Sequence, residues 1–176
     1  SPMFCRSTLG PTEIEVEIVS VGLNFRDVLN VLGLYPGETG PPGNDMCGIV
    51  RRVGTDVRDL GPNERVMGFT IGSLRELNIT RREHVVKAPS RLTDAQASSL
   101  PTVAVTVEVM FYELYSVSST DVILVHAGTG GVGLTAIEYA RVAGATVIAT
   151  AGSDRKVQYL RDLGVAAVFS SRDPDQ

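Results

Sequence analysis

The chain has 176 residues, of which 43% are hydrophobic and 20% charged, and it is long enough to bury a hydrophobic core as one large domain or two small ones. Its 16 Lys and Arg residues are outnumbered by 20 Asp and Glu residues without any basic block, which argues against a nucleic-acid partner. No apolar run approaches the ~20 residues of a membrane span, and the two cysteines, Cys5 and Cys47, cannot form a disulfide framework. We therefore expect a cytoplasmic protein without a membrane segment.

The first half of the chain has the pattern of a mostly β structure. Apolar and polar residues alternate over 13–19, and apolar runs at 48–53 and 84–88 indicate further strands between turn residues. The spacing predicts a short helix over 24–33 and another over 93–99. Residues 100–115 fit either element, because valines alternate from 103 to 109 as in a strand while the length and the later apolar residues suit a helix.

The last third has a regular order of alternating strands and helices. A fully apolar run at 122–125 is typical of a buried parallel strand, and the helix that follows ends near Gly144. Residues 146–151 and 166–169 predict two more strands, separated by a helix over 154–163. The predicted unit is βαβαβ, the first half of a Rossmann dinucleotide-binding domain.

A glycine-rich turn joins the first of these strands to its helix. The residues predicted to bind a cofactor there are Gly128, Gly130, Gly131, Val132 and Gly133. Such glycines allow a sharp turn and a close approach to a diphosphate, which then meets the free N–H groups of the helix N-terminus. The alternative is a merely tight strand-to-helix turn.

The residues after the second strand favour NADPH over NADH. An NAD enzyme has an acid about 20 residues past the glycines, which binds the ribose 2′-hydroxyl. Here Ser153, Arg155 and Lys156 suit a 2′-phosphate, because cations form charge-assisted hydrogen bonds with it. Asp154 opposes this choice, although it also suits the N-terminus of a helix. Lys156 could alternatively be an ordinary solvated lysine.

Few metal ligands are present in the sequence. Cys47 has no cysteine or histidine near it in sequence, and His84 and His126 are the only histidines. Zinc dehydrogenases need Cys, His and acid ligands at characteristic spacing. We expect neither a catalytic nor a structural metal site.

Three parts of the chain together resemble a known family. The segments are Val-Gly-Leu-Asn-Phe-Arg-Asp-Val at 21–28 with Gly-Leu-Tyr-Pro-Gly at 33–37, the glycine turn at 126–133, and Ala-Gly-Ser-Asp-Arg-Lys at 151–156 followed by Phe-Ser-Ser-Arg-Asp at 169–173. This pattern resembles the enoyl reductase domain of polyketide synthases and animal-type fatty acid synthases, in the zinc-free part of the medium-chain dehydrogenase/reductase superfamily. The chain departs from the family pattern at Asn63-Glu64, Glu108 and Met110, which leaves the substrate-side wall undefined.

The resemblance implies both a fold and a reaction. The fold is a partial GroES-like substrate domain over 1–105, a connecting helix over 106–120 and the first half of an NADPH-binding Rossmann domain over 121–176. The reaction is the reduction by NADPH of the 2,3 double bond of a 2-enoyl thioester bound to an acyl carrier protein, alongside other synthase domains.

The resemblance also implies roles for individual residues. It places Tyr35 as a proton donor to the α carbon, with a tyrosine in a Pro-Gly turn as the alternative. It places Asn24 near the nicotinamide, Thr106 at the carboxamide and Arg172 among the cofactor-binding residues. Arg26 and Asp27 are expected to form a structural pair.

Two other functions remain open from sequence, a free-standing quinone or alkenal reductase and a non-catalytic scaffold domain. The ends of the chain suggest a piece of a longer protein. We therefore expect the 176-residue chain to lack turnover, and expect its strand at 122–125 to be an open edge that favours association. Formation of a homodimer is left open.

Overall fold

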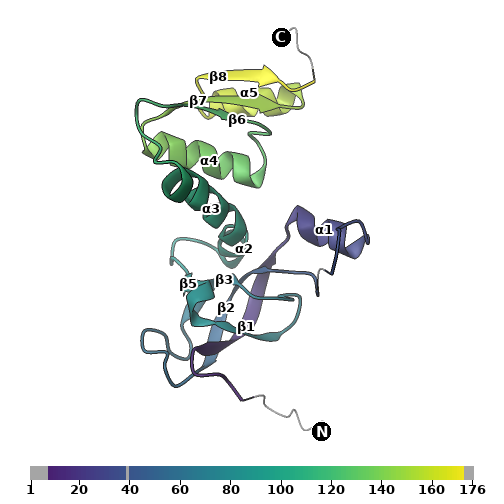
Figure 1. Ribbon diagram of the computed structural model, residues 1–176, viewed down its shortest axis with the longest axis vertical. Helices are drawn as coiled ribbons and strands as arrows, with labels where there is room; N and C mark the ends of the chain where they lie inside the picture. Colours follow the sequence, from purple (N-terminus) through teal and green to yellow (C-terminus); the bar gives the residue numbers. More distant parts are fainter. Residues whose placement is uncertain (1–7, 39, 173–176) are drawn as a thin grey trace. The chain divides into compact units, whose positions relative to one another are not determined.

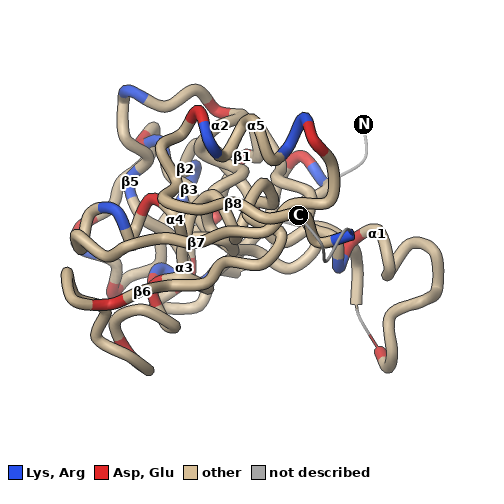
Figure 2. The backbone as a smooth tube through the Cα atoms, turned by 90° about the horizontal axis from the view of Figure 1, so that it is seen from above, with Lys and Arg blue, Asp and Glu red and all other residues tan. Residues whose placement is uncertain are grey.

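The computed structural model describes residues 8–38 and 40–172 of the chain (Figure 1). Cys5 and the acidic end of the family-like segment at 169–173 therefore lie outside the described residues. The chain divides into two compact units, 1–102 and 103–176. Acidic and basic residues are interspersed along the chain in both units (Figure 2). Within the described part, each helix is too short or too polar to cross a membrane.

The first unit is built around a five-stranded antiparallel sheet with the order β4-β1-β2-β3-β5. The strands are β1 (Glu13–Gly22), β2 (Asp45–Val53), β3 (Arg65–Phe69), β4 (Leu77–Arg81) and β5 (Val85–Lys87). Alternation in β1 directs Ile14 and Val16 to one face, where they are completely buried with Met46 and Val50 of β2. The predicted alternation of apolar and polar residues thus places the apolar side chains of β1 in the core of this sheet.

Three short helical segments accompany the sheet: α1 (Phe25–Val31), the 3₁₀ turn η1 (Arg82–His84) and α2 (Asp94–Ser98). Thr93 caps α2, because its hydroxyl accepts from the backbone N–H of Gln96 and the Gln96 side chain accepts from the backbone N–H of Thr93. The helix predicted over 93–99 is therefore confirmed.

The segment that periodicity left open is helical. It forms α3 (Pro101–Glu108), which continues as a π-helical turn, η2 (Val109–Leu114). The segment is helical although its alternating valines suit a strand. Sequence pattern and intrinsic propensity are only weak determinants of secondary structure, and tertiary packing can override them. This helix begins before the expected range of 106–120 and ends sooner.

The second unit is a three-stranded parallel sheet with the order β6-β7-β8. Its elements are β6 (Val122–Val125), α4 (Gly131–Val142), β7 (Thr146–Ala151), α5 (Asp154–Asp162) and β8 (Ala167–Ser170). Ala140 of α4, Ala149 of β7 and Leu160 of α5 are fully buried in one core cluster. The predicted fold class, a β-rich part followed by βαβαβ, is confirmed.

Candidate cofactor-binding site

The glycine-rich turn after β6 is held by close backbone packing. A Cβ on Gly133 would lie 2.8 Å from the Cα of Gly128 and 2.6 Å from the carbonyl oxygen of Ala127. A Cβ on Gly128 would lie 2.9 Å from a side-chain carbon of Leu160 and 3.1 Å from the Cβ of Ala149. The first and last glycines are therefore required by packing, as expected for a dinucleotide-binding turn.

The middle of this turn starts a helix. Gly130 is the N-cap of α4, and no side chain caps this end of the helix. Ala127 has a φ of +50°, which is rare for a residue with a side chain and bends the chain between β6 and α4. The N-terminal N–H groups of α4 can therefore meet an anion together with the positive end of the helix dipole.

A groove of about 470 Å³ brings the glycine turn together with two cations. It is lined by His126, Ala127, Thr129, Gly130, Thr150, Ala151, Gly152, Lys156, Ser171 and Arg172. Lys156 belongs to the first turn of α5 and Arg172 follows β8, so two elements supply the positive charge. Gly152 lies beside the guanidinium, since a Cβ there would be 3.4 Å from Arg172 Nε, an ordinary contact distance.

Other predicted residues of this unit lie outside that groove. Arg155 lines a separate groove of about 410 Å³ with Asp154 and Arg161, and Ser153 is the exposed N-cap of α5. Gly131, Val132 and Gly133 line an apolar groove of about 430 Å³ beside β6. Thr106 lies on α3 and is partly buried.

Several groove residues were missed by sequence reasoning. His126 Nδ1 lies 3.1 Å from the hydroxyl of Thr150, which fixes the imidazole across the carboxyl ends of β6 and β7. Thr129, Gly152 and Ser171 also line the groove. The signal that could have found them is position, because residues just after parallel strands meet at one edge of a sheet.

In the first unit, Tyr35 and Asp27 have defined surroundings. Tyr35 follows α1, and its ring lies 5.4 Å from the guanidinium carbon of Arg26. Asp27 is buried and accepts from the backbone N–H of Asn24 at 2.9 Å and that of Gly43 at 2.8 Å. Asp27 is thus structural, and its carboxylate binds backbone groups.

Asn24 and Thr102 form a polar cluster around the buried carboxylate of Asp45. Asp45 Oδ2 accepts from Asn24 Nδ2 and from the backbone N–H of Thr102, both at 3.1 Å, and Oδ1 accepts from the Thr102 hydroxyl at 2.6 Å. Burial raises the pKa of the Asp45 carboxyl above its ordinary value, and the hydrogen bonds from Thr102 and Asn24 act in the opposite direction. Sequence reasoning found Asn24 but neither partner.

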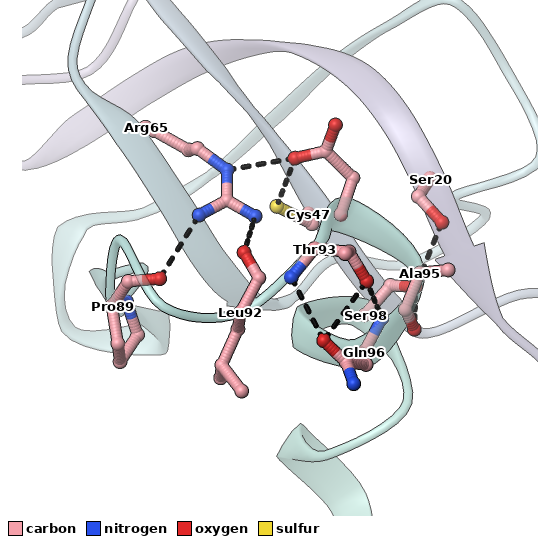
Figure 3. A network of polar contacts seen from close by, with 10 residues as sticks. Ser20, Cys47, Arg65, Pro89, Leu92, Thr93, Ala95, Gln96 and Ser98 are labelled. Atoms are coloured by element: carbon pink, nitrogen blue, oxygen red, sulfur yellow. Dashed lines mark hydrogen bonds and ion pairs between the residues drawn. The ribbon is translucent and has the colours of Figure 1, made fainter.

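A second polar network surrounds Cys47 in the same unit (Figure 3). Arg65 donates to Asp94 Oδ1 at 2.7 Å and to the carbonyl oxygens of Pro89 and Leu92. The Cys47 thiol donates to the same oxygen of Asp94 at 3.5 Å. Burial raises the pKa of this thiol to about 11, so the cysteine behaves as a small core residue.

Metal ligation is not indicated by the side chains that the structure describes. Over residues 8–38 and 40–172, no three His, Cys, Asp or Glu side chains are grouped so that they could hold an ion.

The two units define a class of protein: an antiparallel β domain followed by a dinucleotide-binding βαβαβ unit, as in nicotinamide-dependent oxidoreductases. Residues 10–90 match the family model described as alcohol dehydrogenase GroES-like domain, and residues 131–176 match that described as zinc-binding dehydrogenase. The chain belongs to the medium-chain dehydrogenase/reductase superfamily and, within it, groups with the enoyl reductase domains of polyketide synthases.

Individual relatives support this assignment. The chain is 37% identical over 173 residues to a mycocerosic acid synthase-like polyketide synthase of Mycobacterium tuberculosis, covering 96% of the chain and 8% of that protein. It is 37% identical over 172 residues to erythronolide synthase EryA2 of Saccharopolyspora erythraea, covering 91% of the chain and 5% of that protein.

Among solved structures, the CurK enoyl reductase matches with a TM-score of 0.88 and 33% identity, over 96% of this chain and 54% of that one. The Escherichia coli quinone oxidoreductase complexed with NADPH matches with a TM-score of 0.81 and 29% identity, over 95% and 53%. The chain thus spans about half the length of these two structures and less than a tenth of either synthase.

Proposed function

We propose that this chain is part of an enoyl reductase of a polyketide synthase, which uses NADPH to reduce the 2,3 double bond of an enoyl thioester. The observation that supports it is the groove in which the glycine turn lies beside Lys156 and Arg172. A diphosphate fits the N-terminus of α4, and a 2′-phosphate fits two cations far better than it fits an acid. NADPH is therefore proposed over NADH.

The chemistry needs little from the protein beyond position and one proton. Bound NADPH would supply a hydride to C3 of the enoyl thioester, leaving an enolate to be protonated at C2. Tyr35 is the proposed donor of that proton, since a phenol is a suitable general acid. Asn24 and Thr106 are proposed to contact the nicotinamide side of the cofactor.

The proposed substrate is presented by an acyl carrier protein, with other synthase domains as neighbours. This rests on relatives that are multidomain polyketide synthases. The second candidate is a quinone reductase, because solved quinone oxidoreductases also match the fold. In the enzyme that carries this chain, NADPH-dependent reduction of a crotonyl thioester without reduction of a quinone would separate the two.

Cofactor choice is tested by Lys156→Ala, with Arg155→Ala as a matched control. Both changes remove one cation from the start of α5, but only Lys156 lines the groove with Arg172. We expect Lys156→Ala to weaken NADPH binding by about 1 to 3 kcal/mol, the range for a lost hydrogen bond to a charged group, and to leave NADH nearly unchanged.

Arg155→Ala should affect both cofactors little. Equal losses for NADPH and NADH in Lys156→Ala would remove Lys156 from the 2′-phosphate site. A larger NADPH loss in Arg155→Ala would assign the phosphate to the neighbouring groove instead.

A further inference from the structure

Asp45 is a buried carboxylate for which sequence reasoning gave no role. It is the first residue of β2 and is 1% exposed. Its two oxygens accept from three donors, which belong to the N-cap of α1 and the first turn of α3. Burial of such a group is costly unless it is hydrogen-bonded, and both of its oxygens are hydrogen-bonded here.

This carboxylate determines which way the Asn24 amide is turned. A carboxylate only accepts hydrogen bonds, so the nitrogen of Asn24 must be the atom that faces it. The same nitrogen lies 3.5 Å from the Thr102 hydroxyl, and that hydroxyl uses its own hydrogen on Asp45 Oδ1. Both amide hydrogens of Asn24 are therefore directed into the cluster.

The oxygen of Asn24 has a different position. No side-chain hydrogen bond from Asn24 caps α1, because the backbone N–H of Asp27 donates to the backbone carbonyl oxygen of Asn24 at 2.9 Å. An amide oxygen has two lone pairs that can accept from a ligand. Asn24 is also partly exposed.

We propose that Asp45 is a positioning residue that makes Asn24 an acceptor only, so that the ligand group which meets Asn24 must be a hydrogen-bond donor. This rests on the proposed function, in which Asn24 meets the cofactor. The amino group of the nicotinamide carboxamide is such a donor. A thioester carbonyl or an enolate oxygen is not, and Asn24 is excluded as its partner.

The test compares two ligands in the enzyme that carries this chain. One is NADPH, and the other is 2′-phospho-ADP-ribose, which lacks the nicotinamide. Asp45→Asn gives residue 45 an NH₂ group that can donate, so the Asn24 amide is no longer held in one orientation. We expect Asp45→Asn to weaken NADPH about 5- to 10-fold, equivalent to one hydrogen bond, and to leave 2′-phospho-ADP-ribose unchanged.

The exchange variant Asn24→Asp/Asp45→Asn returns an acceptor-only group to position 24 and should recover most of the NADPH affinity. Thr80→Val is the control for a lost buried hydrogen bond, because Thr80 donates to the carbonyl of Phe69 at 2.8 Å in the same sheet. It should lower stability and leave the ratio of the two affinities at the wild-type value.

Each other outcome decides against the inference. If Asp45→Asn weakened the binding of both ligands equally, or left the ratio of the two affinities as it is in Thr80→Val, Asp45 would be a structural residue only. An exchange variant no better than Asp45→Asn would show that acceptor character at position 24 is not what matters. A wild-type enzyme that fails to bind 2′-phospho-ADP-ribose contradicts the proposed function itself, and the inference with it.

Discussion

Gly133 lies so close to Gly128 that a Cβ on Gly133 would be 2.8 Å from the Cα of Gly128. We predict that Gly133→Ala destabilises the second unit by about 1 to 3 kcal/mol, the usual range for overpacking. The backbone atoms on both sides cannot move aside without distorting the turn. The shift of the midpoint in urea unfolding measures the effect.

Gly130→Ala is the matched control and should behave differently. Gly130 has a φ of −76°, and a Cβ there would lie 3.3 Å from the carbonyl oxygen of Ala127. Stability should change little, whereas cofactor binding should weaken because the new methyl group would lie where we propose that the diphosphate approaches α4. Similar stability losses for both variants would contradict the distinction between a packing glycine and a ligand-facing glycine.

Tyr35→Phe should alter protonation and leave hydride delivery unchanged. The phenylalanine ring keeps the contact with Arg26, which lies 5.4 Å from the tyrosine ring, while the acidic hydroxyl is lost. With a 2-methyl-enoyl thioester, we expect a slower turnover or a changed configuration at the α carbon. Unchanged rate and unchanged stereochemistry would mean that Tyr35 has only a structural place in its turn.

Cys47 should be unreactive in the folded protein at neutral pH. The thiolate is the nucleophile, and burial raises the pKa of this thiol to about 11 from an ordinary 9.0. In a Cys5→Ser background, iodoacetamide should label the folded chain far more slowly than the chain in urea, and labelling should accelerate toward pH 11.

The same shift has a consequence for stability. The folded state holds the thiol proton more tightly than the unfolded state does. The protonated thiol of Cys47 therefore contributes fully to the free energy of unfolding below the ordinary pKa of 9.0, and this contribution is lost as the pH rises through about 11. Rapid labelling of the folded chain at pH 7 would contradict the buried position of the thiol.

The 176-residue chain should associate through β6. This strand pairs only with β7 among the described strands, and Val122 and Leu124 on it are 64% and 56% exposed. Exposed apolar edge strands favour pairing with another chain, and a lysine on the edge opposes it. Leu124→Lys should therefore lower the apparent mass at high concentration in analytical ultracentrifugation.

Val142→Lys is the control for this experiment, because Val142 is also exposed but lies on α4. It should leave association unchanged. A wild-type chain that stays monomeric at all concentrations, or equal effects of the two lysines, would contradict a role for the β6 edge.

The sequence was most informative where pattern and local chemistry agree. The strand at 146–151 and the helix at 154–163 could be predicted because apolar periodicity, turn residues and caps all coincide there. β3 and β4 were missed because they are five-residue strands with charged or polar residues among them, and their pairing partners are distant in sequence.

The site shows the same limit. The glycine turn is local and carries its own signature, whereas Lys156 and Arg172 meet only because β8 lies beside β7 in the sheet. Arg155 was grouped with Lys156 because they are neighbours in sequence, yet their side chains line different grooves. Consecutive residues on a helix point in directions about 100° apart, which a linear motif does not express.

The cluster of Asn24, Asp45 and Thr102 imposes a constraint on how this protein can be altered. Its members are far apart in the sequence but share one set of hydrogen bonds, so substitutions at these positions are not expected to be additive. A library that varies one position at a time would meet mostly losses, since each single change removes hydrogen bonds from the buried Asp45 carboxylate. Mutagenesis aimed at a different cofactor contact should therefore randomise the three positions together.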